Sequence, residues 1–284
     1  MGFDIRKLTL GQVLADKAAA HPDKTFLRMA GDGREYSYAE MHRLSNRLAH
    51  GLAAQGIRQG EIVAPLLESC AEYLMLLFAI AKNGSAAAPV NTAARGDLLA
   101  YYLELADAVA VVTSPALLPR LMDVRGRLPK LRRIFVLDHA GEGMTLPEGT
   151  QDFRVLDVDD DSMPAVEVRY NDLTHLAFTS GTTGPSKAAA YVHAAVLQGA
   201  IAYTEAWGYT ADDTYFVCLP FFHTNALRSS TWIALVVGGT VALSKRFSAS
   251  SLWREVRETR ATTFTSARCC CRRRPPPPRS IRAW

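Results

Sequence analysis

Short apolar runs and amphipathic helical repeats alternate along residues 34–138, and this order constrains the fold more than any other feature of the chain. Ser37 and Glu40 form a capping box at the start of a helical repeat, and Gly56 ends that repeat. Residues 61–67 follow as an apolar run typical of a buried strand. Strand and helix in turn favour a layered α/β fold with largely parallel sheets. On the same grounds we expect helices at 71–82, 98–106, 196–207 and 252–258, and strands at 86–90, 109–113, 133–137, 175–179, 215–219, 240–243 and 262–265.

The chain has 284 residues, enough for one or two domains with a sizeable core. Hydrophobic residues make up 49% and charged residues 21%, which argues against wholesale disorder. The longest apolar stretches, 73–81 and 232–243, are shorter than the ~18 residues of a membrane-spanning helix. The first ten residues lack the apolar region of a secretory signal. We therefore expect a cytoplasmic protein with no transmembrane segment, and peripheral contact with a membrane stays open.

The net charge of +4 comes from the C-terminal end of the chain. Residues 267–284 contain six arginines and no acidic residue, whereas residues 1–266 contain 26 basic and 28 acidic residues, a net charge of −2. The body therefore has no basic excess that would indicate a nucleic-acid partner. Only Cys70 and Cys218 of the five cysteines lie before residue 267, which indicates a reducing compartment and no disulfide framework.

Residues 178–188 read Phe-Thr-Ser-Gly-Thr-Thr-Gly-Pro-Ser-Lys-Ala, a segment rich in glycine and hydroxyl groups that follows a predicted strand. Glycines let the backbone approach a phosphate closely, hydroxyl groups add donors, and Lys187 adds a positive charge. The spacing differs from that of a Walker A loop. The residues alone thus predict a phosphate-binding loop, and a flexible surface hairpin stays as the alternative.

The order Thr-Ser-Gly-Thr-Thr-Gly-x-x-Lys resembles the signature loop of the AMP-forming adenylating enzymes, which include acyl-CoA synthetases, luciferases and carrier-protein-loading adenylation domains. Residues 82–85 and 89–91 resemble a second family segment, Lys-x-Gly followed by Pro-x-Asn. Residues 219–225, Leu-Pro-Phe-Phe-His-Thr-Asn, resemble the Pro-x-Phe-His motif in the form found in ligases of fatty acids or of crotonobetaine and carnitine. The similarity runs in family order from about Leu10 to Thr265.

This resemblance implies a two-step acid–thiol ligase. A carboxylate attacks the α-phosphate of ATP to give an acyl-adenylate and pyrophosphate, and the thiolate of coenzyme A then displaces AMP to give the acyl-CoA. Mg²⁺ would bridge the phosphate oxygens, with no residue of this chain assigned to the metal. His223 is the expected catalytic residue, and Phe222 and Asn225 are expected to line the acid pocket. The resemblance assigns the phosphates of ATP to Thr179, Ser180, Gly181, Thr182, Thr183, Gly184 and Lys187.

Two alternatives to the acyl-CoA synthetase stay open at this point. An adenylating enzyme that loads a carrier protein would share the same motifs. The other is a non-catalytic fragment that binds nucleotide, or nothing, and has no turnover. Glu205, within Tyr203-Thr204-Glu205, resembles part of a further family motif, but it comes too early in the chain and is not expected to act as that motif does.

The chain also departs from the family pattern. Family members are about twice as long, and their adenine-binding segment, ribose-binding aspartate and small C-terminal domain have no counterpart here. We therefore expect residues 1–266 to be a truncated AMP-binding domain, and the chain to be an incomplete, inactive fragment. Residues 267–284, rich in Arg, Pro and Cys, are expected to be a disordered tail from a shifted reading frame. A genuine arginine-rich interaction tail is the alternative.

Overall fold

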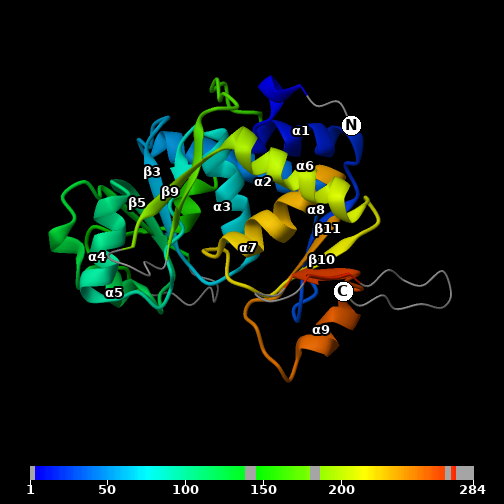
Figure 1. The fold of residues 1–284 in the computed structure, drawn as a ribbon. Coiled ribbons are helices and arrows are strands. Elements are labelled where there is room, and N and C mark those ends of the chain that lie inside the picture. Colours follow the sequence, from blue (N-terminus) through cyan, green and yellow to red (C-terminus); the bar gives the residue numbers. More distant parts are fainter. Residues whose placement is uncertain (1–3, 138–144, 180–185, 266–269, 273–284) are drawn as a thin grey trace. The chain divides into compact units, whose positions relative to one another are not determined.

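The computed structural model describes residues 4–137, 145–179, 186–265 and 270–272, and Figure 1 shows its elements in chain order. The chain divides into two compact units. The first unit comprises Met1–His42, Ser69–Leu74 and Ala194–Trp284. The second unit comprises Arg43–Glu68 and Met75–His193. Helices α2 (Tyr38–Ala54) and α3 (Ala71–Lys82) contribute residues to both units.

The first unit contains a mostly parallel sheet with the strand order β13-β12-β10-β11-β1-β2 among the described residues. The pairs β1–β11, β10–β11 and β10–β12 are parallel, and the outer pairs β1–β2 and β12–β13 are antiparallel. Its strands are β1 (Thr25–Met29), β2 (Glu35–Ser37), β10 (Thr214–Val217), β11 (Thr240–Leu243), β12 (Thr263–Thr265) and β13 (Cys270–Arg272). Its helices are α1 (Leu10–Ala20), α6 (His193–Trp207, from Ala194 on), α7 (Thr224–Ala226), the π-helical turn η4 (Leu227–Thr231), α8 (Trp232–Val237), α9 (Leu252–Glu258) and the 3₁₀ turn η1 (Ile5–Lys7).

The second unit contains a sheet with the order β7-β6-β5-β3-β4-β8-β9. All its neighbouring pairs are parallel except β8–β9, which is antiparallel. Its strands are β3 (Ile62–Leu66), β4 (Ala86–Ala87), β5 (Ala108–Thr113), β6 (Arg133–Val136), β7 (Gln151–Asp152), β8 (Leu173–Phe178) and β9 (Ala188–Val192). Its own helices are α4 (Gly96–Leu105), α5 (Leu118–Met122) and the 3₁₀ turns η2 (Arg125–Arg127) and η3 (Phe153–Leu156).

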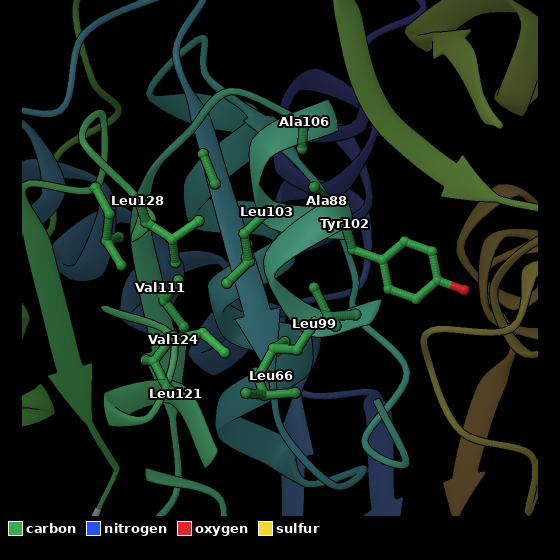
Figure 2. Packing of buried hydrophobic residues seen from close by; sticks show 14 of the residues in the cluster. Leu66, Ala88, Leu99, Tyr102, Leu103, Ala106, Val111, Leu121, Val124 and Leu128 are labelled. Atoms are coloured by element: carbon green, nitrogen blue, oxygen red, sulfur yellow. The ribbon is translucent and has the colours of Figure 1, made fainter. Parts of the chain in front are cut away.

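The core of the second unit lies between its sheet and helices α4 and α5. Figure 2 shows Leu99 and Leu103 of α4 and Leu121 of α5 against Leu66 of β3 and Val111 of β5. Each of these side chains is at most 2% exposed, so the helices cover this face of the sheet with apolar groups. Burial of both sheet faces is typical of parallel strands, and it explains the nearly continuous apolar sequence of β5.

The predicted α/β fold with largely parallel sheets is confirmed. The capping box is present as two hydrogen bonds: the Ser37 N–H donates to Glu40 Oε2 at 2.8 Å, and the Glu40 N–H donates to Ser37 Oγ at 3.2 Å. Gly56 follows α2 with φ of +80°, a conformation that glycine adopts without strain. The predicted strand at 86–90 is shorter than expected, since only Ala86–Ala87 form β4.

The segment 141–161 is acidic and rich in turn-forming residues, a composition that predicts a solvated surface excursion, and from residue 145 on this prediction is partly wrong. Phe153 is 7% exposed and Leu156 is fully buried. A Cβ atom added at Gly51 of α2 would overlap the backbone carbonyl of Leu156, so the segment packs directly on this helix. The apolar residues of the segment are outnumbered by its acidic and turn-forming residues, so its composition does not reveal the buried part.

The expectation of no regular structure after Ser266 does not hold for Cys270–Arg272. The backbone of these residues forms β13, paired antiparallel with β12. Residues 266–269 and 273–284 lie outside the described part of the chain. Among the described residues, no helix combines the length and the apolar character needed to cross a membrane.

Candidate functional site

The glycine-rich loop connects two antiparallel strands of the second unit. Phe178, the last residue of β8, pairs with Ala188, the first residue of β9. One step further, the Thr179 N–H donates to the Lys187 carbonyl at 2.9 Å, and the Lys187 N–H donates to Thr179 Oγ1 at 3.3 Å. These bonds fix the two ends of the loop side by side. The other predicted phosphate-binding residues, Ser180, Gly181, Thr182, Thr183 and Gly184, lie outside the described residues.

Both described residues of the predicted phosphate-binding set are accessible. Thr179 and Lys187 are exposed, whereas the strands that precede and follow them are mostly half-buried. The backbone of Lys187 is already ordered by the hairpin, so binding of an anion by its side chain carries no further entropy cost for ordering this backbone. The geometry therefore suits a phosphate-bearing ligand.

Helix α4 holds the base of the same loop. The Tyr101 hydroxyl donates to the Ser186 carbonyl at 2.6 Å, and the Tyr102 hydroxyl lies 3.2 Å from Ser186 Oγ. The Tyr102 ring stacks on Phe178, with ring centroids 4.5 Å apart. Neither tyrosine could be predicted from the sequence, because both lie more than 75 residues before the loop and no local pattern connects them to it.

The predicted aromatic–histidine segment belongs to the first unit and follows β10. Phe221 anchors it: its side chain is 1% exposed and meets the Tyr73 ring edge-on at 5.4 Å between centroids. The Phe221 N–H donates to Ser69 Oγ at 3.3 Å. The backbone and the side chain of Phe221 are thus both fixed, and Phe221 anchors the start of the segment that contains Phe222 and His223.

His223 itself is exposed and precedes α7. Its ring lies against Phe222, with centroids 4.7 Å apart and planes tilted by 42°, and Phe222 is half-buried. Asn225 is also half-buried, and its Oδ1 atom is buried without a hydrogen-bond partner in the described structure. A buried acceptor without a partner is costly, so this atom is suited to receive a donor from a ligand. Phe222 and His223 are thus in ring contact and Asn225 follows them closely in the sequence, whereas the loop residues belong to the second unit.

Lys82, the lysine of the predicted Lys-x-Gly segment, is not part of an accessible site. It is 1% exposed, and its Nζ atom lies 2.7 Å from both Ser45 Oγ and Asn46 Oδ1. Burial lowers the pKa of its amine to about 6. A pKa near 6 favours the uncharged amine at neutral pH, and this amine donates to both partners.

The described residues contain no group of three or more His, Cys, Asp or Glu side chains that could hold a metal ion.

A family model described as AMP-binding enzyme matches residues 14–268. The chain belongs to the AMP-binding enzyme family. This match confirms the resemblance to the adenylating enzymes that the loop motif indicated.

Two curated members of the AMP-binding family illustrate the similarity. The chain is 33% identical over 263 residues to the medium/long-chain-fatty-acid–CoA ligase FadD6 of Mycobacterium tuberculosis, an alignment that covers 91% of this chain and 42% of the relative. It is 30% identical over 263 residues to the crotonobetaine/carnitine–CoA ligase of Salmonella paratyphi A, covering 89% of this chain and 50% of the relative. The chain thus spans half or less of the length of these two relatives.

A solved structure shows the same fold. The anthranilate CoA ligase AuaEII, in complex with anthranoyl-AMP, matches 92% of this chain and 50% of its own chain with a TM-score of 0.83. The two sequences are 23% identical, so this likeness bears on the fold alone.

Proposed function

We propose that this AMP-binding family member is part of an ATP-dependent acid–thiol ligase that activates a carboxylic acid as its acyl-adenylate and transfers the acyl group to coenzyme A. The observation that carries the proposal is the loop from Thr179 to Lys187, fixed at both ends and bearing an exposed lysine, inside a family match that covers residues 14–268. ATP, Mg²⁺ and coenzyme A are the implied co-substrates and ion.

In this proposal the loop binds the phosphates of ATP. Thr179 and Lys187 supply a hydroxyl and a positive charge, and Ser180, Gly181, Thr182, Thr183 and Gly184 complete the loop. Activation of a carboxylate by ATP needs chiefly positioning and neutralisation of phosphate charge. A lysine held at a fixed hairpin can do both, because little reorganisation is needed when the charge develops.

The acid would bind against Phe222 and Asn225, with His223 as the catalytic residue. Phe222 offers a half-buried aromatic ring to an acyl chain, and Asn225 Oδ1 offers a buried acceptor. We propose a fatty or carnitine-like acid, because the two curated relatives are named as ligases of such acids.

A stable mimic of the acyl-adenylate tests this function without requiring turnover. The purified chain is titrated with acyl-sulfamoyl-adenosines carrying a long fatty chain, a short fatty chain or a carnitine-like acyl group. Such mimics of a reaction intermediate bind more tightly than substrates, by about 10²-fold or more. We expect at least one mimic to bind more tightly than ATP and to weaken when Phe222 is changed to Ala. Binding of none of them would contradict the proposal for this chain.

Turnover is measured separately, with ATP, Mg²⁺, the same acids and either coenzyme A or a phosphopantetheinyl carrier protein as thiol acceptor. The choice of acceptor separates the ligase from a carrier-protein-loading enzyme. The expectation that these 284 residues alone give little turnover stays a prediction, and acyl-CoA formation near the ~10 s⁻¹ of an ordinary enzyme would contradict it.

A further inference from the structure

We propose that Tyr101 and Tyr102 of α4 are positioning residues for the glycine-rich loop, which hold its C-terminal end so that Lys187 meets the phosphates of a nucleotide. This inference rests on the proposed function of the loop. It concerns contacts within the second unit only.

Three contacts join α4 to the loop base. The Tyr101 hydroxyl donates to the Ser186 carbonyl at 2.6 Å, and the Tyr102 hydroxyl lies 3.2 Å from Ser186 Oγ. On the other side of the loop, Phe178 stacks on the Tyr102 ring with planes inclined by 28°. Two adjacent residues of α4 therefore contact both Phe178, which precedes the loop, and Ser186, which precedes Lys187.

The two tyrosines are well placed to act as rigid anchors. Tyr102 is 9% exposed and belongs to the core cluster, and Tyr101 packs against that cluster. Figure 2 shows the Tyr102 ring leaving α4 on the side away from Val111 and Leu128, with its hydroxyl directed out of the cluster. The rings are thus fixed by packing, while the hydroxyl groups are free to hold a neighbouring segment.

A hairpin without these bonds would still pair through Thr179 and Lys187. That pair alone is one point of attachment and does not fix the orientation of the hairpin end. The bonds to Ser186 add a second fixed point one residue before Lys187. Two points of attachment fix the orientation of the hairpin end that carries Lys187, and this orientation serves the binding of phosphate.

Removing single oxygen atoms tests the inference. Tyr101→Phe and Tyr102→Phe delete the hydroxyl groups and keep the rings, and Tyr170→Phe, at a 36% exposed tyrosine of the same unit, is the matched control. ATP and AMP affinities are measured by calorimetry. We expect each test variant to lose about 3- to 10-fold in ATP affinity, the effect of one hydrogen bond, and to keep its AMP affinity, because AMP lacks the β- and γ-phosphates. The control should match the wild type for both.

A double-mutant cycle separates positioning from a general loss of packing. Ser186→Ala removes the partner of Tyr102 but leaves the carbonyl that Tyr101 binds. The losses of Ser186→Ala and Tyr102→Phe should therefore be non-additive, whereas those of Ser186→Ala and Tyr101→Phe should add. Equal losses of ATP and AMP affinity, or unchanged ATP affinity in both tyrosine variants, would overturn the inference.

Hydrogen exchange in the absence of nucleotide keeps the inference apart from the proposed function. We expect the Lys187 amide to exchange faster in Tyr101→Phe and Tyr102→Phe than in the wild type, and not in Tyr170→Phe. If the wild type binds neither nucleotide, the proposed function fails. The exchange result then still shows whether Tyr101 and Tyr102 hold the C-terminal end of the loop. Unchanged exchange in both variants overturns it whatever the nucleotide result.

Discussion

Lys82 shows how a single buried group sets a pH dependence. The residue is 1% exposed, its amine donates to Ser45 Oγ and Asn46 Oδ1, and burial lowers its pKa from an ordinary 10.5 to about 6. Between these two values the unfolded chain binds a proton that the folded chain does not. Folding is therefore penalised as the pH falls from 10.5 towards 6, and stability rises with pH across this window.

We expect Lys82→Met to remove this dependence. The unfolding free energy of the wild type minus that of the variant should increase with pH, by up to about 1.4 kcal/mol per pH unit between pH 7 and 9. Urea unfolding at several pH values measures it, and taking the difference cancels the titration of all other groups. Parallel stability curves for the two proteins would show that Lys82 is charged in the folded state.

The residue scale is also where the sequence was least informative about the candidate site. The loop motif and the segment around His223 could be recognised from the sequence, because each consists of consecutive residues. Tyr101, Tyr102 and Ser69 were not, because their contacts with Ser186 and Phe221 join segments far apart in the chain. Lys82 was recognisable as part of a motif, but its burial depends on packing that no short motif describes.

At the scale of elements, the contact between α2 and η3 depends on the absence of a side chain. Gly51 lies in α2 directly against the backbone of Leu156, and an added Cβ atom would overlap it. In a helix, alanine is otherwise favoured over glycine by about 1 kcal/mol. The steric effect and the helix propensity therefore act in opposite directions at this position.

We expect Gly51→Ala to destabilise the protein by about 1–3 kcal/mol, since backbone atoms must move to make room. Gly199→Ala is the matched control, because Gly199 lies in α6 and an added Cβ would meet only Arg228, at an ordinary 3.6 Å. The control should be neutral or more stable by up to about 1 kcal/mol. Thermal melting of both variants decides, and a stable Gly51→Ala protein would show that η3 does not pack on α2 as described.

The segment after Ser266 allows another test on this scale. We propose that residues 267–284 are separate from the AMP-binding portion, since the family match ends at residue 268. Within that segment, β13 contributes only a three-residue ladder to β12. A chain that ends at Ser266 should melt within about 4 °C of the full chain, the shift that ~1 kcal/mol produces in a protein of this size. A much larger loss would show that β13 is integral to its sheet.

At the scale of the whole molecule, the order of strands and helices was predictable but their division into two sheets was not. Apolar periodicity reports the type of each element and not its pairing partner. The first unit joins β1 and β2 to β10, β11 and β12, across most of the chain. The second unit interrupts that sheet and forms its own from β3 to β9. Boundaries were accurate where a cap or glycine marked them, as at Ser37 and Gly56.

The central claim, that the loop ending at Lys187 binds the phosphates of ATP, is tested most directly by calorimetric titration of the purified chain with ATP and Mg²⁺. We compare the wild type with Lys187→Ala and, as a control, with Lys130→Ala, a surface lysine of the same unit that pairs with Asp107. Loss of one charged contact should weaken ATP binding by about 10- to 100-fold in Lys187→Ala, with AMP binding nearly unchanged and the control equal to the wild type. Equal ATP affinity in the wild type and Lys187→Ala, or no ATP binding by the folded wild type, would contradict the account.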